Sequence, residues 1–139
     1  MAADEFQAAF WAAKRALSDA SELAFRRHGV RAGQQYILLT LWTEDGLTPG
    51  EVARRLDLAT STVTRACMRM EAAGLLVRRP HPGDGRLVRL CLTERGRALR
   101  QAIDEETVGL TERALGSLDD AERERFVDFL ARMREGLTH

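Results

Sequence analysis

TPGEVARRLDLATSTVTRACMRMEAAGLLVRRPHPGDGRLVRLCLT, residues 48–93, is the stretch that decides the fold. It begins with two helical patterns joined by a short turn, and a β-hairpin pattern follows them. Thr48, Pro49 and Glu51 predict the start of the first helix, because they combine a capping box with a proline at the first helical position. The apolar side chains that follow recur at helical spacing, so one face of this helix is expected to be buried.

The second helix of this stretch is predicted to start at Thr60 or Ser61, because both residue types cap helices well. Apolar and small residues then recur at helical spacing and are expected to face the core. These inward positions are Val63, Ala66, Cys67, Met70 and Gly74. The opposite face is polar and basic at its N-terminal end and comprises Ser61, Thr62, Arg65, Met68, Arg69 and Ala72.

This outward face allows two interpretations. A recognition helix in a major groove presents its N-terminal residues to base edges. Arginine can bond guanine at two acceptors, and Ser or Thr hydroxyls can bond several bases. The alternative is an ordinary amphipathic helix with a solvated face. The following residues favour the first interpretation, because two β-prone runs, 75–79 and 86–92, flank a Pro/Gly turn and predict a basic hairpin.

A helix-turn-helix followed at once by a basic hairpin is a winged helix, and here the sequence resembles a known family. Asp84-Gly85-Arg86, then Leu90-Cys91-Leu92-Thr93 and Gly96, resemble the wing signature of the MarR family of bacterial transcription regulators. The segment 61–65, STVTR, resembles the recognition helix of that family, and the match covers nearly the whole chain. Gly85 departs from the family pattern, where many relatives carry Lys or Arg, and it removes a phosphate contact.

The resemblance implies a mainly α fold with a small β-wing, in which residues 30–96 form a winged helix-turn-helix. It also implies that the chain is a single domain, 1–139, with N- and C-terminal dimerisation helices at 1–29 and 97–139. The whole length of 139 residues is typical of one domain.

Further elements follow from local patterns. Residues 4–28 read as one helix, and 93–115 as another. The run 32–43 is too apolar for its period to separate a buried helix from a strand, and helix is the choice that the resemblance implies. Asp119 and Glu122 predict the start of the last helix, again as a cap with an acid three residues later.

Composition excludes several classes of protein. With 45% hydrophobic and 30% charged residues, the chain has the composition of a globular protein that is expected to be cytoplasmic. No apolar run approaches the ~20 residues of a membrane helix, and the N-terminus has no signal-peptide pattern.

Net charge is zero, but residues 48–100 hold eleven Arg and five acidic residues, a net charge of +6. The rest of the chain carries −6, and this asymmetry predicts a basic surface that binds an anion.

Apolar stripes at both ends of the chain predict a homodimer. The predicted helix over residues 4–28 carries a heptad seam, although packing of this helix on its own domain is the alternative. A symmetric dimer is the usual way to cover more apolar surface than one core can use. The seam consists of Phe6, Phe10, Ala13, Leu17, Ala20 and Ala24, and the last helix contributes Phe126, Phe129, Leu130, Met133 and Leu137.

The sequence indicates neither an enzyme nor a metal or cofactor site. The three histidines, His28, His81 and His139, are scattered, and no motif for metal, phosphate or nucleophilic chemistry occurs. Cys67 and Cys91 predict no disulfide framework. Some family members sense oxidants through cysteine, so a redox-sensing regulator is one alternative, but Cys67 lies on the inward face and is expected to pack in the core.

The function predicted is a ligand-responsive repressor that acts as a homodimer on a pseudo-palindromic operator in double-stranded DNA. A winged-helix module that binds protein and not DNA is the second alternative. Ser61, Thr62, Thr64, Arg65 and Arg69 are predicted in the major groove, Arg86 in the minor groove with Asp84 holding it, and Arg78, Arg79 and Arg89 at phosphates. The resemblance also implies a small aromatic or phenolic effector, with Trp11, Arg15, Tyr36 and Trp42 as candidate contacts.

Overall fold

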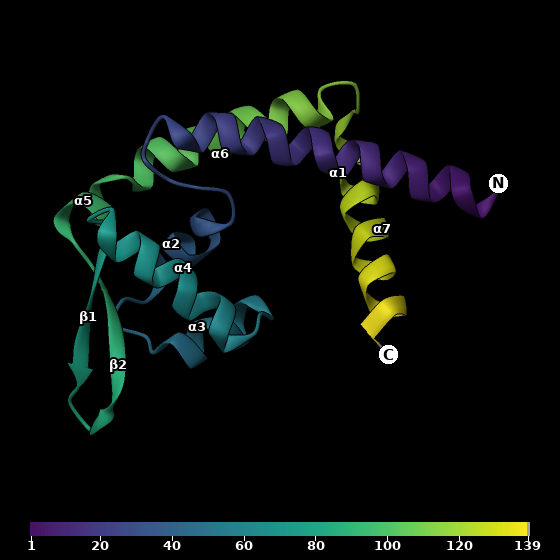
Figure 1. Cartoon of the computed structure of the whole chain (residues 1–139). Coiled ribbons are helices and arrows are strands. Elements are labelled where there is room, and N and C mark those ends of the chain that lie inside the picture. Colours follow the sequence, from purple (N-terminus) through teal and green to yellow (C-terminus); the bar gives the residue numbers. More distant parts are fainter. Residues whose placement is uncertain (139) are drawn as a thin grey trace. The chain divides into compact units, whose positions relative to one another are not determined.

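The computed structural model describes residues 1–138, so His139 lies outside the described residues. Contacts divide the chain into two compact units, Met1–Glu106 and the residues from Thr107 on. The elements, labelled in Figure 1, are α1 (Ala3–Arg26), α2 (Gln34–Thr43), α3 (Pro49–Leu56), α4 (Thr60–Ala72), β1 (Leu76–His81), β2 (Asp84–Leu92), α5 (Glu94–Ala98), α6 (Arg100–Leu115) and α7 (Asp120–Thr138). None of the helices described is long and apolar enough to span a bilayer. The mainly α fold with a small β-wing is confirmed.

The helix-turn-helix consists of α3 and α4. The predicted capping box at α3 is confirmed, because Glu51 N–H donates to Thr48 Oγ1 at 3.2 Å and Thr48 N–H donates to Glu51 Oε1 at 3.1 Å. Asp57 adopts a left-handed conformation with φ 55° and ends α3. The predicted cap of α4 is wrong: Ala59 occupies the N-cap position, and its side chain has no hydroxyl to accept a bond.

The inward face of α4 packs into the core of the winged helix as predicted. Val63, Cys67 and Met70 are buried, and Ala66 is half-buried. Gly74 is the exception, since it lies past the end of α4, is exposed and adopts φ 78°. It turns the chain into β1 and does not fill the core. The partners in this core include Leu38, Leu41, Val52, Leu75, Leu76 and Leu90.

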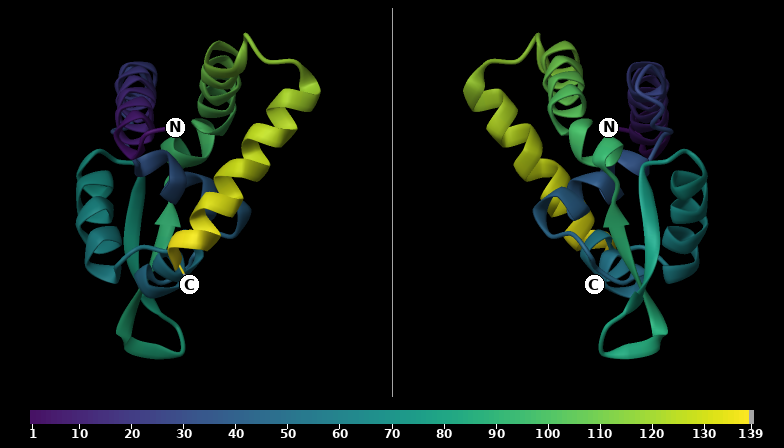
Figure 2. Two further views of the ribbon diagram at one scale, coloured as in Figure 1. Left: turned by 90° about the vertical axis from the view of Figure 1, so that its right-hand side faces the viewer. Right: turned by 90° about the vertical axis from the view of Figure 1, so that its left-hand side faces the viewer.

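The wing is a two-stranded antiparallel hairpin that extends beyond α2, α3 and α4 (Figure 2). At its base Leu76 pairs with Leu92, and a further bridge joins Leu47 to Leu90, so the base is anchored in the core. The pairing becomes irregular between Pro80 and His81, next to the turn. Because Pro has no N–H to donate to the ladder, an irregularity near this residue is expected.

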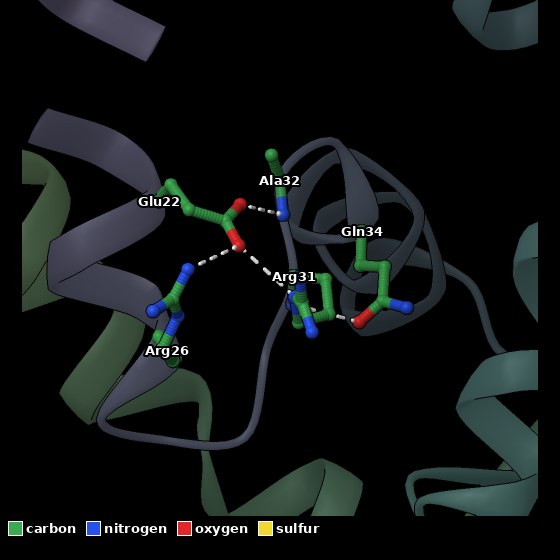
Figure 3. A network of polar contacts seen from close by, with 5 residues as sticks. All are labelled: Glu22, Arg26, Arg31, Ala32 and Gln34. Atoms are coloured by element: carbon green, nitrogen blue, oxygen red, sulfur yellow. Dashed lines mark hydrogen bonds and ion pairs between the residues drawn. The ribbon is translucent and has the colours of Figure 1, made fainter. Parts of the chain in front are cut away.

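The segment 32–43, which the period left open, contains the helix α2. A network around Glu22 joins the end of α1 to the start of α2 (Figure 3). The Glu22 carboxylate accepts bonds from Ala32 N–H at 2.9 Å, Arg31 Nε at 3.0 Å and Arg26 Nη2 at 3.4 Å. The Ala32 N–H, followed by the two arginines, lowers the pKa of Glu22, so this carboxylate is charged at neutral pH and holds the turn.

The single helix predicted over 93–115 is divided in the structure. Thr93 Oγ1 accepts from Gly96 N–H at 3.1 Å and caps the five-residue helix α5. Leu99 follows as the C-cap of α5, and α6 begins at the next residue. Periodicity did not reveal this break because Leu99, which separates the two helices, itself keeps a right-handed helical backbone with φ −74° and ψ −12°.

The second unit contains the end of α6 and the helix α7. The predicted cap at Asp119 is confirmed, since Glu122 N–H donates to Asp119 Oδ1 at 2.9 Å and Asp119 N–H to Glu122 Oε1 at 3.0 Å. No residue of α7 is buried within the described chain, and Phe126, Phe129 and Leu130 are each at least 40% exposed. The stripe that predicted subunit pairing is therefore uncovered in the single chain.

Candidate nucleic-acid interface

The outward face of α4 presents hydroxyl and guanidinium groups to solvent. Ser61, Thr62, Arg65 and Arg69 are all exposed, whereas Thr64 is half-buried. Within the described part of the chain, the side chains of Arg65 and Arg69 form no hydrogen bond or ion pair. These two arginines can therefore bind an external acceptor without first releasing a partner within the chain.

The tip of the wing carries a preformed Asp–Arg pair. Asp84 Oδ1 accepts from the backbone N–H of Arg86 at 3.0 Å and from its Nε at 3.2 Å, while Oδ2 accepts from Nη2 at 3.3 Å. The Arg86 side chain is 89% exposed despite these bonds. The Arg86 side chain, and then its backbone N–H, lower the pKa of Asp84. The carboxylate thus holds the base of the guanidinium while the rest projects into solvent, which is the arrangement predicted from sequence.

The three arginines predicted at phosphates occupy different environments. Arg78 is engaged by Glu71, whose carboxylate accepts its Nε at 2.9 Å and its backbone N–H at 3.1 Å. These two contacts, the backbone one first, lower the pKa of Glu71, so the charge of Arg78 is compensated at neutral pH. Arg79 pairs with Arg89 across the hairpin, and Arg79 is exposed.

Arg89 is half-buried, and its guanidinium lies 3.7 Å from the place that a Cβ on Gly46 would occupy. Its Nε is buried and has no hydrogen-bond partner among the described residues. Its Nη2 lies 4.0 Å from Cys91 Sγ. The structure therefore leaves Arg79 as the more accessible of this cross-strand pair. Like charges directly opposite on a hairpin are destabilising, and an anion that binds beside Arg79 would relieve the repulsion.

The arginines of residues 48–100 fall into two groups, those that bond within the fold and those that stay exposed without an ion pair. Three arginines donate to backbone carbonyls that the helices and strands leave open, and so belong to the fold. They are Arg95 with Ala73, Arg97 with Leu92, and Arg100 with Trp42. Arg54, on α3, is exposed and has no ion pair in the described chain. Arg54 is not among the residues predicted from the sequence, although it lies on the first helix of the helix-turn-helix.

The four candidate effector contacts occupy different environments in the structure. Trp11 is 61% exposed and Tyr36 is 56% exposed, and Arg15 is exposed too. Trp42 is half-buried, and its Nε1 donates to the carbonyl of Gly96 at 2.9 Å. The indole N–H of Trp42 is therefore already hydrogen-bonded within the chain. A shallow depression between α2 and α3 is lined by Leu39, Thr40, Thr43 and Arg55, and by none of the four.

Cys67 is buried in the core, as predicted, and burial raises the pKa of its thiol to about 11. Because the thiolate is the reactive form, Cys67 is expected to resist alkylation by iodoacetamide at pH 8 in the folded protein. Cys91 is half-buried on the wing and serves as the internal comparison. Mass spectrometry of native and urea-unfolded protein checks this: rapid modification of Cys67 before unfolding would contradict the expectation.

The acidic, histidine and cysteine side chains of residues 1–138 do not gather into a second site. No group of three or more His, Cys, Asp or Glu side chains there could hold a metal ion. His28 contacts Glu106 at 3.3 Å and His81 accepts from Gly83 N–H at 3.0 Å, so each has a local partner.

The chain is similar to known helix-turn-helix regulators. Residues 28–87 match the model of the MarR family. The chain is 34% identical to the HTH-type transcriptional regulator TtmR of Methylorubrum extorquens, over 93% of the chain and 65% of that protein, so it spans just under two thirds of this relative's length. It is 31% identical to the uncharacterized HTH-type transcriptional regulator Mb0904 of Mycobacterium bovis, over 74% of the chain and 73% of that protein.

A solved structure shows the same fold. The chain superposes on a MarR family transcriptional regulator from Listeria monocytogenes, solved in complex with a 26mer DNA, with a TM-score of 0.80. The two share 23% identity, and the match covers 94% of this chain and 87% of that one. At this identity the likeness concerns the fold, which is a winged helix preceded and followed along the chain by further helices.

Proposed function

The chain belongs to the MarR family of helix-turn-helix transcriptional regulators, and from this premise we propose that it binds double-stranded DNA as a homodimer. The observation that carries the proposal is the outward face of α4, where Arg65 and Arg69 stand exposed and unpaired among hydroxyl side chains. Ser61, Thr62 and Thr64 complete the surface that would enter a major groove. The wing supplies Arg86 to a neighbouring minor groove, with Asp84 as its support.

Phosphate contacts are assigned by accessibility. Arg79 on the wing and Arg54 on α3 are exposed and form no ion pair among the described residues, and both would meet the backbone of the duplex. Arg78 and Arg89 are weaker candidates, because Glu71 engages the first and the second is half-buried. A phosphate contact positions the protein without reading sequence, so these residues contribute affinity and not specificity.

The proposed dimer rests on uncovered apolar side chains. In α1, Phe6 and Phe10 are each 39% exposed and Leu17 is 51% exposed, and α7 has the exposed stripe described above. A second copy of the chain would cover these faces by the symmetry that homodimers use. Sedimentation equilibrium tests this: a mass of two chains at micromolar concentration supports the dimer, and a single-chain mass at high concentration would overturn it.

We extend the proposal to a repressor that a small aromatic or phenolic acid releases from DNA. Arg15, Trp11 and Tyr36 are exposed side chains of the first unit that could meet such a ligand, while Trp42 has its indole N–H engaged. The test is DNA release by a panel of aromatic carboxylates. Arg15→Ala should reduce sensitivity to an active compound and leave DNA affinity unchanged; an unaltered response would remove Arg15 from the site.

The DNA proposal is tested by selection from random duplexes followed by footprinting. A pseudo-palindrome with half-sites roughly 10 base pairs apart is expected, since two recognition helices related by a two-fold axis meet successive major grooves. Arg65→Ala serves as the comparison protein in the same selection. Failure to enrich any sequence, together with no retention on heparin at low salt, would favour a winged helix that binds protein.

A further inference from the structure

Met68 is an exposed apolar side chain on an otherwise polar surface. It is 52% exposed, and it is the only large apolar side chain of α4 that is exposed, since Val63, Cys67 and Met70 are buried. Single exposed apolar residues are common on protein surfaces, so exposure alone assigns no role. The position of Met68 within α4 does.

Met68 shares the face of the arginine that is proposed to read a base. Residues three and four apart lie side by side on a helix, so Met68 and Arg69 both follow Arg65 on the same face. Ser61 precedes Arg65 by four residues and lies there too. If Arg65 contacts a base edge in the major groove, Met68 therefore lies close to the same base edges.

The chemistry of the major groove offers one kind of partner to such a side chain. Methionine has no donor and only a weak acceptor, so it cannot satisfy the polar edge of a G·C pair. The C5 methyl group of thymine is the apolar group that the major groove displays. A polarizable and flexible thioether adapts well to a small apolar contact of this kind.

We propose that Met68 is a specificity-determining residue that selects thymine by contacting its methyl group. Three residues advance an α-helix by about 4.5 Å, close to the ~3.4 Å between base pairs. Met68 therefore meets a base pair next to the one that Arg65 reads. This inference rests on the proposed DNA binding, and it adds a base preference that neither the hydroxyl nor the guanidinium groups supply.

The experiment removes the methyl group from the DNA and the thioether from the protein. Each thymine of the selected operator is replaced in turn by deoxyuridine, which keeps every hydrogen-bonding group. At one thymine per half-site, this change should weaken binding of the unmodified protein about fourfold, the effect of one buried methyl group. Met68→Ala should bind both duplexes equally at that position, whereas Met68→Leu should retain the sensitivity.

Leu58→Ala is the matched control, because Leu58 is 46% exposed but lies in the turn outside α4. It should show the full loss with deoxyuridine. If Met68→Ala loses as much as the unmodified protein at every thymine, the inference is wrong while DNA binding stands. If the unmodified protein selects no operator, the proposed function fails and the inference with it. Equal urea midpoints for the variants confirm that an exposed residue was changed without harm to the fold.

Discussion

Gly96→Ala is expected to lower the free energy of unfolding by about 3 kcal/mol, a loss at the upper end for overpacked sites. A Cβ at Gly96 would clash with the carbonyl oxygen of Leu75 and lie 3.2 Å from Leu92 Cδ2. The carbonyl cannot move freely, because it accepts the N–H of Thr93 at 3.1 Å. The carbonyl of Gly96 is also held, by the indole of Trp42. Relief of the clash would therefore disturb α5 and the base of the wing together.

Gly109→Ala is the matched control, since Gly109 is also a helical glycine but nothing lies within 4 Å of its added Cβ. There the higher helix propensity of alanine should stabilise the protein by about 0.5–1 kcal/mol. Urea denaturation followed by circular dichroism measures both changes. If Gly96→Ala unfolds at the same urea concentration as the unmodified protein, the close approach to Leu75 does not constrain this residue.

Local signals in the sequence predicted the elements whose causes are local. The Thr48–Glu51 and Asp119–Glu122 boxes place both partners three residues apart, so the pattern alone indicates the hydrogen bonds that the structure contains. The predicted start of α4 was wrong for a physical reason. The left-handed Asp57 and the bond from Leu58 N–H to the Ala53 carbonyl set the path of the turn. That path brings Ala59 to the cap position.

The candidate site divides in the same way. Asp84 and Arg86 are two residues apart, and their contact could be predicted from the turn that carries them. The engagement of Arg95 and Arg97 with the carbonyls of Ala73 and Leu92 could not, because it depends on where distant segments meet. A count of charges in the sequence therefore overestimates the arginines that are free to bind an anion. Gly96 matched a family signature, but only the packed structure shows that its lack of a side chain is required.

Arg65→Ala is expected to weaken binding to the selected operator by roughly 1–3 kcal/mol and to relax the preference at one base pair of each half-site. The reason is that an exposed, unpaired guanidinium on the face of α4 can bond a guanine at two acceptors. Affinities for the operator and for a set of single-base variants measure both effects. Arg113→Ala removes one charge from an exposed position of α6 and is the control for non-specific electrostatics.

Arg86→Ala is expected to act differently, because a minor groove shows a degenerate pattern but a strong negative potential where it is narrow. Binding should weaken on most sequences, with the greatest loss on A·T-rich flanks. The slope of log affinity against log salt should fall by roughly one unit per wing. Asp84→Ala should give a milder form of the same change, since Asp84 restrains Arg86 by three hydrogen bonds and is not proposed to touch DNA.

The two arginine variants can be separated by one set of titrations, in which flank composition and salt concentration are varied on a fixed operator core. Arg65→Ala should keep the dependence on the flank and lose discrimination within the core, whereas Arg86→Ala should do the reverse. The reciprocal pattern follows from the geometry, because Arg65 lies on the helix proposed to enter the major groove and Arg86 at the tip of the wing. If Arg86→Ala binds every flank as tightly as the unmodified protein, with an unchanged salt slope, the wing does not contact DNA.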